Sequence, residues 1–141
     1  MMNITVVGTG YVGLSNAVLF ARQHTVNSLD IDAKRVELIN QRLSPIADDY
    51  IERTLKDSEL KLTATLNKEA AYKNADYIII ATPTNYDSDT NSFDTSSIES
   101  VIADILPINT TAPIIIKSTI PVGYTAQIKV KFKTEQIIFS P

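Results

Sequence analysis

The sequence contains no cysteine, one histidine and only four glycines among its 141 residues. Without cysteine the chain forms no disulfide, holds no thiolate metal site and has no cysteine nucleophile. No apolar run comes close to the ~20 residues that a membrane-spanning helix requires. A net charge of −3 and an isoelectric point near 5.1 give no electrostatic reason to expect nucleic acid or an anionic membrane as a partner.

The length and composition are those of one ordinary globular domain. Hydrophobic residues make up 44% of the chain and charged residues 21%, which suits a single core. The first predicted strand begins at about Asn3, which leaves no room for a signal peptide before it. A cytoplasmic, cofactor-using domain over residues 1–141 fits these properties, and many other small domains would fit them as well.

Strand-like and helix-like stretches alternate along the whole chain. Strands are predicted at residues 4–7, 26–30, 61–65, 77–81, 113–117 and 136–139. Helices are predicted from Leu14 onward and at residues 36–43, 48–58, 67–72, 96–106 and 122–132, with Asn67 as one cap and a Ser96/Glu99 capping box as another. This alternation predicts an α/β fold of the Rossmann type: a doubly wound parallel sheet of about six strands, with helices on both faces. The expected strand order is 3-2-1-4-5-6, with a ligand at the carboxyl ends of the strands.

Three of the four glycines form a GxGxxG motif, at Gly8, Gly10 and Gly13. The motif follows the first strand and opens the first helix, which is the context of a dinucleotide-binding loop. Gly8 allows a tight turn, Gly10 lets the main chain approach a pyrophosphate, and Gly13 lets the helix pack closely on the sheet. Tyr11, within the loop, either covers the cofactor or packs against the sheet. The alternative for the motif is a glycine-rich turn with no ligand.

Asp30 ends the second predicted strand, 17 residues after Gly13, close to the ~20 expected for the acid that binds the adenosine ribose. Such a carboxylate repels a 2′-phosphate, so NAD is favoured over NADP. Asp32 competes for this role but is better placed to begin the next helix. Lys34 and Arg35 count slightly against NAD, because a basic group accommodates a 2′-phosphate.

Several other polar residues have ordinary structural interpretations. His24, near the end of the first helix, is interpreted as a surface residue or a partner of the helix dipole. Asp87, Asp89 and Asp94 lack the spacing of a calcium loop and are interpreted as solvated, so no metal site is expected. Thr84 and Thr119 have two possible roles. Their hydroxyls either contact a cofactor or form hydrogen bonds with the main chain of nearby turns. In the second interpretation Thr82 and Ser118 form such bonds as well.

The sequence resembles the UDP-glucose/GDP-mannose dehydrogenase family, and its UDP-glucose branch in particular. The matching stretches are GTGYVGLS at 8–15, SPI at 44–46, ATPTNYD at 81–87, FDT at 93–95, KSTIPVG at 117–123 and IFSP at 138–141. The glycine loop occurs in many dehydrogenases, whereas the ATPTNYD and KSTIPVG stretches are much more specific. The resemblance covers essentially the whole chain.

The resemblance implies that Val12, Asp30, Arg35, Thr84 and Thr119 contact NAD, with Arg35 at a position where the family usually has lysine. It also implies a role in the chemistry for Thr119, which helps to hold a water or the sugar oxygen. Family enzymes oxidise UDP-glucose to UDP-glucuronate with two NAD and a cysteine thiolate that traps the intermediate, and the parent enzyme is expected to be a homodimer.

That cysteine, the central helix and the UDP-sugar domain of the family have no counterpart in this sequence. We therefore expect a fragment that is inactive alone. Two alternatives stay open: the cofactor domain of a sibling enzyme acting on another nucleotide sugar, such as UDP-N-acetylmannosamine, and a non-catalytic NAD-binding module.

Overall fold

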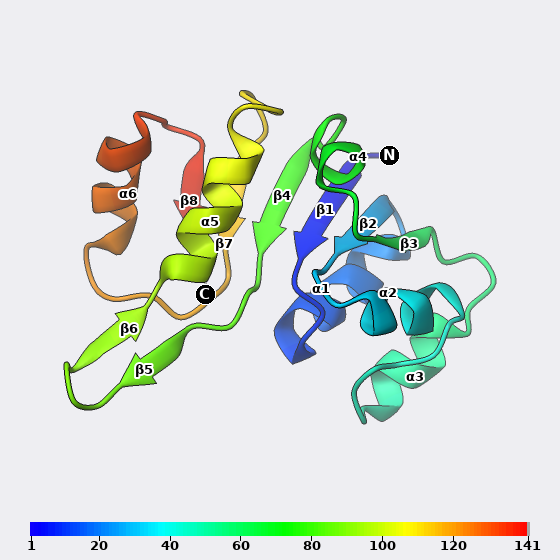
Figure 1. Ribbon diagram of the computed structural model, residues 1–141. Helices are drawn as coiled ribbons and strands as arrows, with labels where there is room; N and C mark the ends of the chain where they lie inside the picture. The colour runs from blue at the N-terminus through cyan, green and yellow to red at the C-terminus, as the bar shows by residue number, and fades with distance from the viewer. Residues whose placement is uncertain (141) are drawn as a thin grey trace.

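Six parallel strands form an open sheet in the computed structural model, which describes residues 1–140 apart from the side chain of Ser92 (Figure 1). Their order is β3-β2-β1-β4-β7-β8, which is the predicted 3-2-1-4-5-6 once a separate hairpin is left out. Pro141, the last residue of the matching stretch at 138–141, lies outside the described residues. The strands of this sheet are β1 (Asn3–Val7), β2 (Thr25–Leu29), β3 (Leu62–Thr65), β4 (Tyr77–Ile80), β7 (Ile114–Ile116) and β8 (Ile137–Phe139).

Helices cover both faces of the sheet, so the predicted fold class is confirmed. The helices are α1 (Tyr11–Ala21), α2 (Ala33–Asn40), α3 (Asp49–Leu55), α4 (Lys68–Tyr72), α5 (Ser96–Ile105) and α6 (Tyr124–Phe132). Residues of α1, α2 and α3 share one buried cluster with alternate strand residues, such as Leu14, Ile39 and Leu55. Residues of α4, α5 and α6 form the second cluster on the opposite face, with Ile102 and Ile128 among them. Burying these two apolar layers is the main driving force for the fold.

Side chains begin several helices where the sequence predicts. Asp32 accepts hydrogen bonds from the main-chain N–H groups of Lys34 and Arg35, so it caps α2. Asn67 caps α4 in the same way, through Ala70. These caps satisfy N–H groups that have no acceptor within the helix.

The Ser96/Glu99 capping box is wrong by one residue. Thr95 is the N-cap of α5, and its hydroxyl donates to the Glu99 carboxylate at 3.2 Å. The Ser96 N–H instead donates to Asp94 at 3.0 Å. The start of α6 also lies later than predicted: Gly123, with φ of 83°, precedes it, and the Tyr124 N–H donates to the Pro121 carbonyl. A turn therefore occupies residues 121–123, whereas the predicted helix began at Val122.

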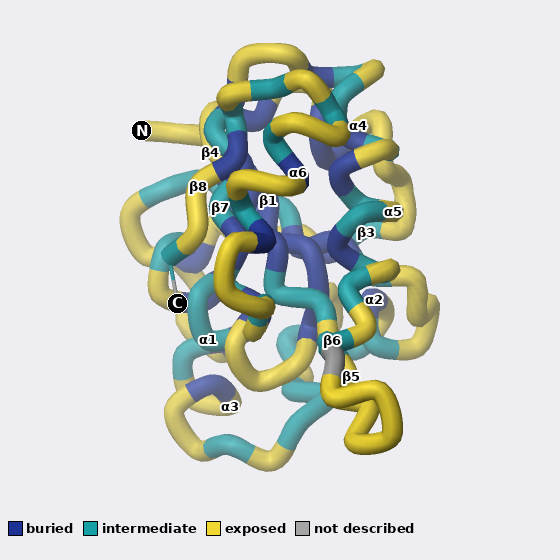
Figure 2. The backbone as a smooth tube through the Cα atoms, turned by 90° about the vertical axis from the view of Figure 1, so that its left-hand side faces the viewer, coloured by how far each residue is buried: buried dark blue, intermediate teal, exposed yellow. Residues whose placement is uncertain are grey.

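A two-stranded antiparallel hairpin, β5 (Asn85–Asp87) and β6 (Ser92–Asp94), interrupts the βα alternation. It extends away from the main sheet and is largely exposed (Figures 1 and 2). Tyr86 and Phe93 pair across it edge to face, with ring centroids 5.2 Å apart. The sequence analysis predicted no strand in this segment.

The strand register brings four loops to one edge of the sheet. Val7 pairs with Leu29 on one side and with Ile80 on the other, and Ile80 pairs with Ile116. Because these strands are parallel and end at the same level, the segments that follow β1, β2, β4 and β7 meet there. The glycine loop, Asp30 and the two family-specific stretches all begin at this edge.

Candidate functional site

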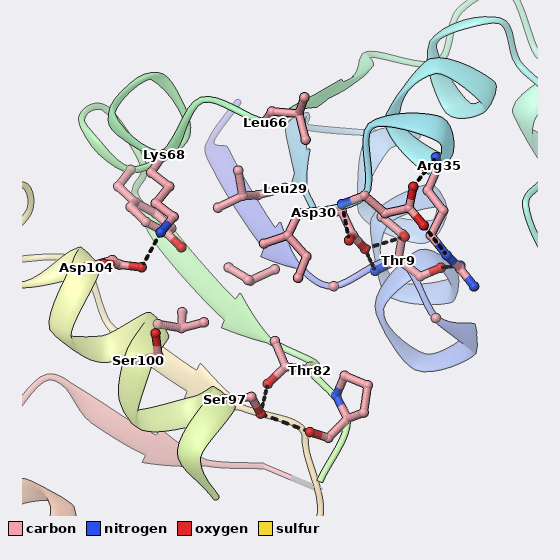
Figure 3. Close-up of a pocket in the computed structure, with 18 residues that line it drawn as sticks. Thr9, Leu29, Asp30, Arg35, Leu66, Lys68, Thr82, Ser97, Ser100 and Asp104 are labelled. Atoms are coloured by element: carbon pink, nitrogen blue, oxygen red, sulfur yellow. Dashed lines mark hydrogen bonds and ion pairs between the residues drawn. The ribbon is translucent and has the colours of Figure 1, made fainter.

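A cleft of about 580 Å³ opens at this carboxyl edge, beside the switch point between β1 and β4 (Figure 3). Its floor includes Val7 and Leu29, the last residues of β1 and β2. The glycine loop and the segment after β2 form one end, and residues of α4 and α5 form the other. This is where a doubly wound sheet binds its ligand.

The three glycines of the motif serve different structural purposes. Gly8 has φ of +103°, and a Cβ there would lie 2.6 Å from the Ala81 carbonyl oxygen. A Cβ at Gly13 would lie 2.2 Å from the Gly8 carbonyl oxygen, so α1 reaches the loop only because this residue lacks a side chain. A Cβ at Gly10 would meet no described atom within 4 Å. Gly8 thus forms a tight turn, Gly13 permits a close packing contact, and the main chain at Gly10 is open to its surroundings.

The carboxylate of Asp30 is tied to the glycine loop. Its Oδ2 accepts from the main-chain N–H of Thr9 at 3.0 Å and from the Thr9 hydroxyl at 2.5 Å. Its Oδ1 accepts from the N–H of Asp32 at 3.0 Å. Asp30 also lines the cleft, so the same carboxylate borders the cleft and fixes the glycine loop.

The guanidinium of Arg35 holds the same loop from the opposite side. Its Nη1 donates to the Thr9 carbonyl at 3.0 Å, and its Nε lies 3.8 Å from Asp32 Oδ2. Arg35 also lines the cleft. The two side chains that the sequence singled out therefore meet at Thr9, which the sequence analysis gave no role.

The ATPTNYD and KSTIPVG stretches lie side by side after β4 and β7. The Thr84 hydroxyl donates to the Thr119 carbonyl at 2.8 Å, and the Ser118 hydroxyl donates to the Thr82 carbonyl at 2.7 Å. Thr84 and Ser118 thus satisfy turn carbonyls, which was one of the two interpretations. Within residues 1–140, which the structure describes, neither Thr84 nor Thr119 lines the cleft. They lie beyond its Thr82 end.

The first turn of α1 carries three further predicted cofactor residues, Tyr11, Val12 and Gly13. Tyr11 is 64% exposed and Val12 48% exposed, so Tyr11 does not pack against the sheet. In the described chain none of the three lines the cleft. As members of the first helical turn they present N–H groups that have no acceptor within the helix, at the positive end of its dipole.

Residues of α4 and α5 form the end of the cleft opposite Asp30, and the sequence analysis missed them. Lys68 Nζ lies 2.8 Å from Asp104 Oδ2, and both line the cleft with Tyr72. Burial raises the pKa of the Tyr72 phenol, and the nearby Asp104 charge adds to the shift, so this hydroxyl stays protonated. Helical spacing could have indicated that the α5 residues share one face of their helix. The cleft-lining residues of α5 recur at i, i+3, i+4 and i+7: Ser97, Ser100, Val101 and Asp104.

The model of the NAD-binding domain of the UDP-glucose/GDP-mannose dehydrogenase family matches residues 2–138. The chain belongs to this family. It is 53% identical over 140 residues to a UDP-glucose 6-dehydrogenase of Streptococcus pneumoniae, and 51% identical over 142 residues to one of Campylobacter jejuni. Each alignment covers 99% of this chain and 36% of the relative. A UDP-D-ManNAc dehydrogenase structure from Pyrococcus horikoshii superposes with a TM-score of 0.86 at 31% identity, over 98% of this chain and 34% of that one.

As a member of the UDP-glucose/GDP-mannose dehydrogenase family, this chain is an NAD-binding domain, with NAD as its cofactor. The chain spans about a third of the length of the relatives it matches. The glycine loop, the cleft and Asp30 fit the adenosine and pyrophosphate parts of NAD, because Gly10 leaves open space and Asp30 borders the cleft.

The remaining polar residues serve local structure. His24 Nδ1 accepts from the main-chain N–H of Met2 at 3.2 Å. Asp87 and Asp94 accept from nearby main-chain N–H groups of Asp89 and Ser96. Over residues 1–140, no group of three His, Cys, Asp or Glu side chains is arranged to hold a metal ion. Within the same residues, no helix has both the length and the apolar character needed to cross a membrane.

Proposed function

We propose that this chain is the NAD-binding part, over residues 1–141, of an enzyme that oxidises UDP-glucose to UDP-glucuronate. The names and 51–53% identities of the two bacterial relatives support this substrate. When bound, NAD would supply the hydride acceptor for this oxidation. The observation that carries the cofactor site is the placement of the open Gly10 main chain and the Asp30 carboxylate on one cleft.

We assign the adenosine half of NAD to the cleft. The free N–H groups at Gly10, Tyr11, Val12 and Gly13 face the direction from which a pyrophosphate approaches a helix terminus. Gly8 shapes the turn that presents them. Asp30 accepts a hydrogen bond from the adenosine ribose, and Arg35 keeps the glycine loop in position through the Thr9 carbonyl.

Thr84 and Thr119 are assigned to the nicotinamide end. Both follow strands on the β4–β7 side of the switch point, away from Asp30, and their loops are joined by the 2.8 Å bond between them. Because the Thr84 hydroxyl donates to Thr119, its oxygen can still accept from a carboxamide N–H. The Thr119 side chain is exposed, so its hydroxyl is available to a water or to the sugar oxygen. We propose Thr119 as the catalytic residue of this chain on that basis.

Calorimetric titration of the polypeptide with NAD, NADP and UDP-glucose tests the proposal, with Asp30→Ala as the comparison variant. We expect NAD to bind more tightly than NADP, and we expect Asp30→Ala to weaken NAD binding. UDP-glucose should bind little, because the sugar-binding domain of the family has no counterpart in this chain. Equal binding of the two cofactors, or no effect of Asp30→Ala, would contradict the assignment of Asp30.

A sibling nucleotide-sugar substrate is the second candidate, because the UDP-D-ManNAc dehydrogenase structure shares this fold at 31% identity. Assays of the full-length natural protein distinguish the two substrates. NADH formation is measured with UDP-glucose and with UDP-N-acetylmannosamine. Absence of NADH with any nucleotide sugar would favour a non-catalytic NAD-binding module. The parent enzyme is proposed to be a homodimer, which sedimentation of the same polypeptide tests.

A further inference from the structure

We propose that Thr9 is a positioning residue that sets the preference for NAD over NADP. The inference rests on the proposed function, because it concerns how the same cleft reads the adenosine ribose. Thr9 is 1% exposed, so its side chain does not serve as a free surface hydroxyl. Its three polar groups instead engage the two charged side chains that face the cleft.

The first step concerns the acceptor sites of Asp30. An ionised carboxylate offers about four lone-pair sites, two on each oxygen. In the described residues the Thr9 N–H and hydroxyl fill the two sites on Oδ2, at 3.0 and 2.5 Å. The Asp32 N–H fills one site on Oδ1. One site, on Oδ1, is therefore left for a ligand, and it belongs to a carboxylate that cannot rotate without breaking its bonds to Thr9.

The second step concerns Arg35, whose charge would otherwise favour a 2′-phosphate. The Thr9 carbonyl accepts from Nη1 at 3.0 Å, and Asp32 lies against Nε at 3.8 Å. Figure 3 shows the guanidinium beside Thr9, with Asp30 on the other side of the same residue. Thr9 thus holds the Asp30 carboxylate so that its remaining acceptor site is directed toward the ribose. Its carbonyl also keeps the Arg35 guanidinium bound to the main chain. A ribose hydroxyl can donate to the remaining site of Asp30, whereas a phosphate at that position meets a negative charge.

Replacing Thr9 by valine removes one donor while nearly keeping the shape of the side chain. Oδ2 then loses its shortest bond, and the carboxylate gains freedom to turn away from the ribose. Charge-assisted hydrogen bonds are the stronger class, so we expect NAD affinity to fall roughly tenfold. The Thr9 main chain is unchanged, so Arg35 stays in place and NADP affinity should change by less than about threefold. The NAD/NADP affinity ratio should therefore fall.

The experiment measures affinities of NAD, NADP and nicotinamide 2′-deoxyadenosine dinucleotide by calorimetry for the wild type, Thr9→Val and Thr9→Ser. The 2′-deoxy analogue lacks the hydroxyl that Asp30 would accept from, so its affinity should be the same for wild type and Thr9→Val. Thr9→Ser keeps the donor and should restore the wild-type NAD/NADP ratio. A variant that merely loosens the fold would weaken all three ligands alike.

Thr5→Val is the matched control. Thr5 is also 1% exposed, and its hydroxyl donates to the Ala71 carbonyl, away from the cleft. The Thr5→Val substitution should lower the melting temperature and leave the affinities for the three ligands unchanged. If the wild type binds NAD but Thr9→Val keeps its NAD/NADP ratio, the role of Thr9 is overturned and the proposed function stands. If the wild type binds no NAD, both are overturned.

Discussion

The hydroxyl of Thr84 donates to the main-chain carbonyl of Thr119 across 2.8 Å, joining the segment after β4 to the segment after β7. These are the ATPTNYD and KSTIPVG stretches, on which the resemblance to the family largely rests. Their contact means that the nicotinamide end of the site, as assigned above, is held by a bond between loops 35 residues apart in sequence.

Thr84→Val tests that assignment by removing the bond between the two loops. We expect NAD to bind roughly fivefold to tenfold more weakly, the effect of losing one neutral hydrogen bond of about 1 kcal/mol. ADP-ribose has the adenosine half and no nicotinamide, so it should bind the variant and the wild type equally. Calorimetry with both ligands gives the answer, and an equal loss for ADP-ribose would place Thr84 outside the nicotinamide end.

Gly10 and Gly13 should respond in opposite ways to alanine. A Cβ at Gly13 would lie 2.2 Å from the Gly8 carbonyl oxygen, whereas a Cβ at Gly10 meets no described atom within 4 Å. We expect Gly13→Ala to lower the free energy of unfolding by about 3 kcal/mol or more. Gly10→Ala should stay folded with a small change, and should weaken NAD binding because its methyl group occupies the path of the pyrophosphate. Thermal melts and NAD titrations of both variants check this, and a stable Gly13→Ala protein would refute the packing argument.

The strands were predictable from hydrophobic periodicity, and their order was predictable because alternating strands and helices with right-handed crossovers favour the doubly wound arrangement. The apolar runs at residues 4–7 and 77–81 are short, branched and continuous, as expected for strands buried on both faces. The hairpin of β5 and β6 was missed because residues 85–87 of β5 are all exposed. Such a strand lacks the alternation of buried and exposed positions by which a strand is predicted from sequence.

The candidate site was predictable only in part, for a physical reason. The glycine pattern encodes local main-chain geometry, and local geometry can be read from spacing. The role proposed for Thr9 depends on the glycine loop, the segment after β2 and helix α2 coming together, since Asp30 and Arg35 lie 21 and 26 residues away from Thr9 in sequence. The capping error at Ser96 has a similar origin, because Asp94 offers a competing acceptor for its N–H. Which of several adjacent polar residues makes a bond is decided by small differences in main-chain direction.

Ile31→Ser tests the apolar edge of the cleft. Ile31 lines the cleft and is 92% exposed, so its side chain contributes little to folding but offers an apolar surface to a planar base. We expect stability to change by less than about 0.5 kcal/mol and NAD affinity to fall by roughly fivefold to tenfold, from about 1 kcal/mol of lost apolar contact. Val130→Ser on α6, 78% exposed and outside the cleft, is the matched control and should change neither quantity. Unaltered NAD affinity in Ile31→Ser would place the adenine elsewhere.

Turnover distinguishes cofactor binding from catalysis. The family resemblance implies a cysteine thiolate that traps the oxidised sugar, and this chain has no cysteine. We therefore expect the 141-residue polypeptide to bind NAD but to form no NADH from UDP-glucose, even at saturating concentrations of both. The absorbance of NADH at high protein concentration measures this directly, with calorimetric NAD binding on the same sample as the control for a folded site. Steady NADH formation would show that the residues at this sheet edge complete a hydride transfer without the thiolate, and would make Thr119 the first residue to replace.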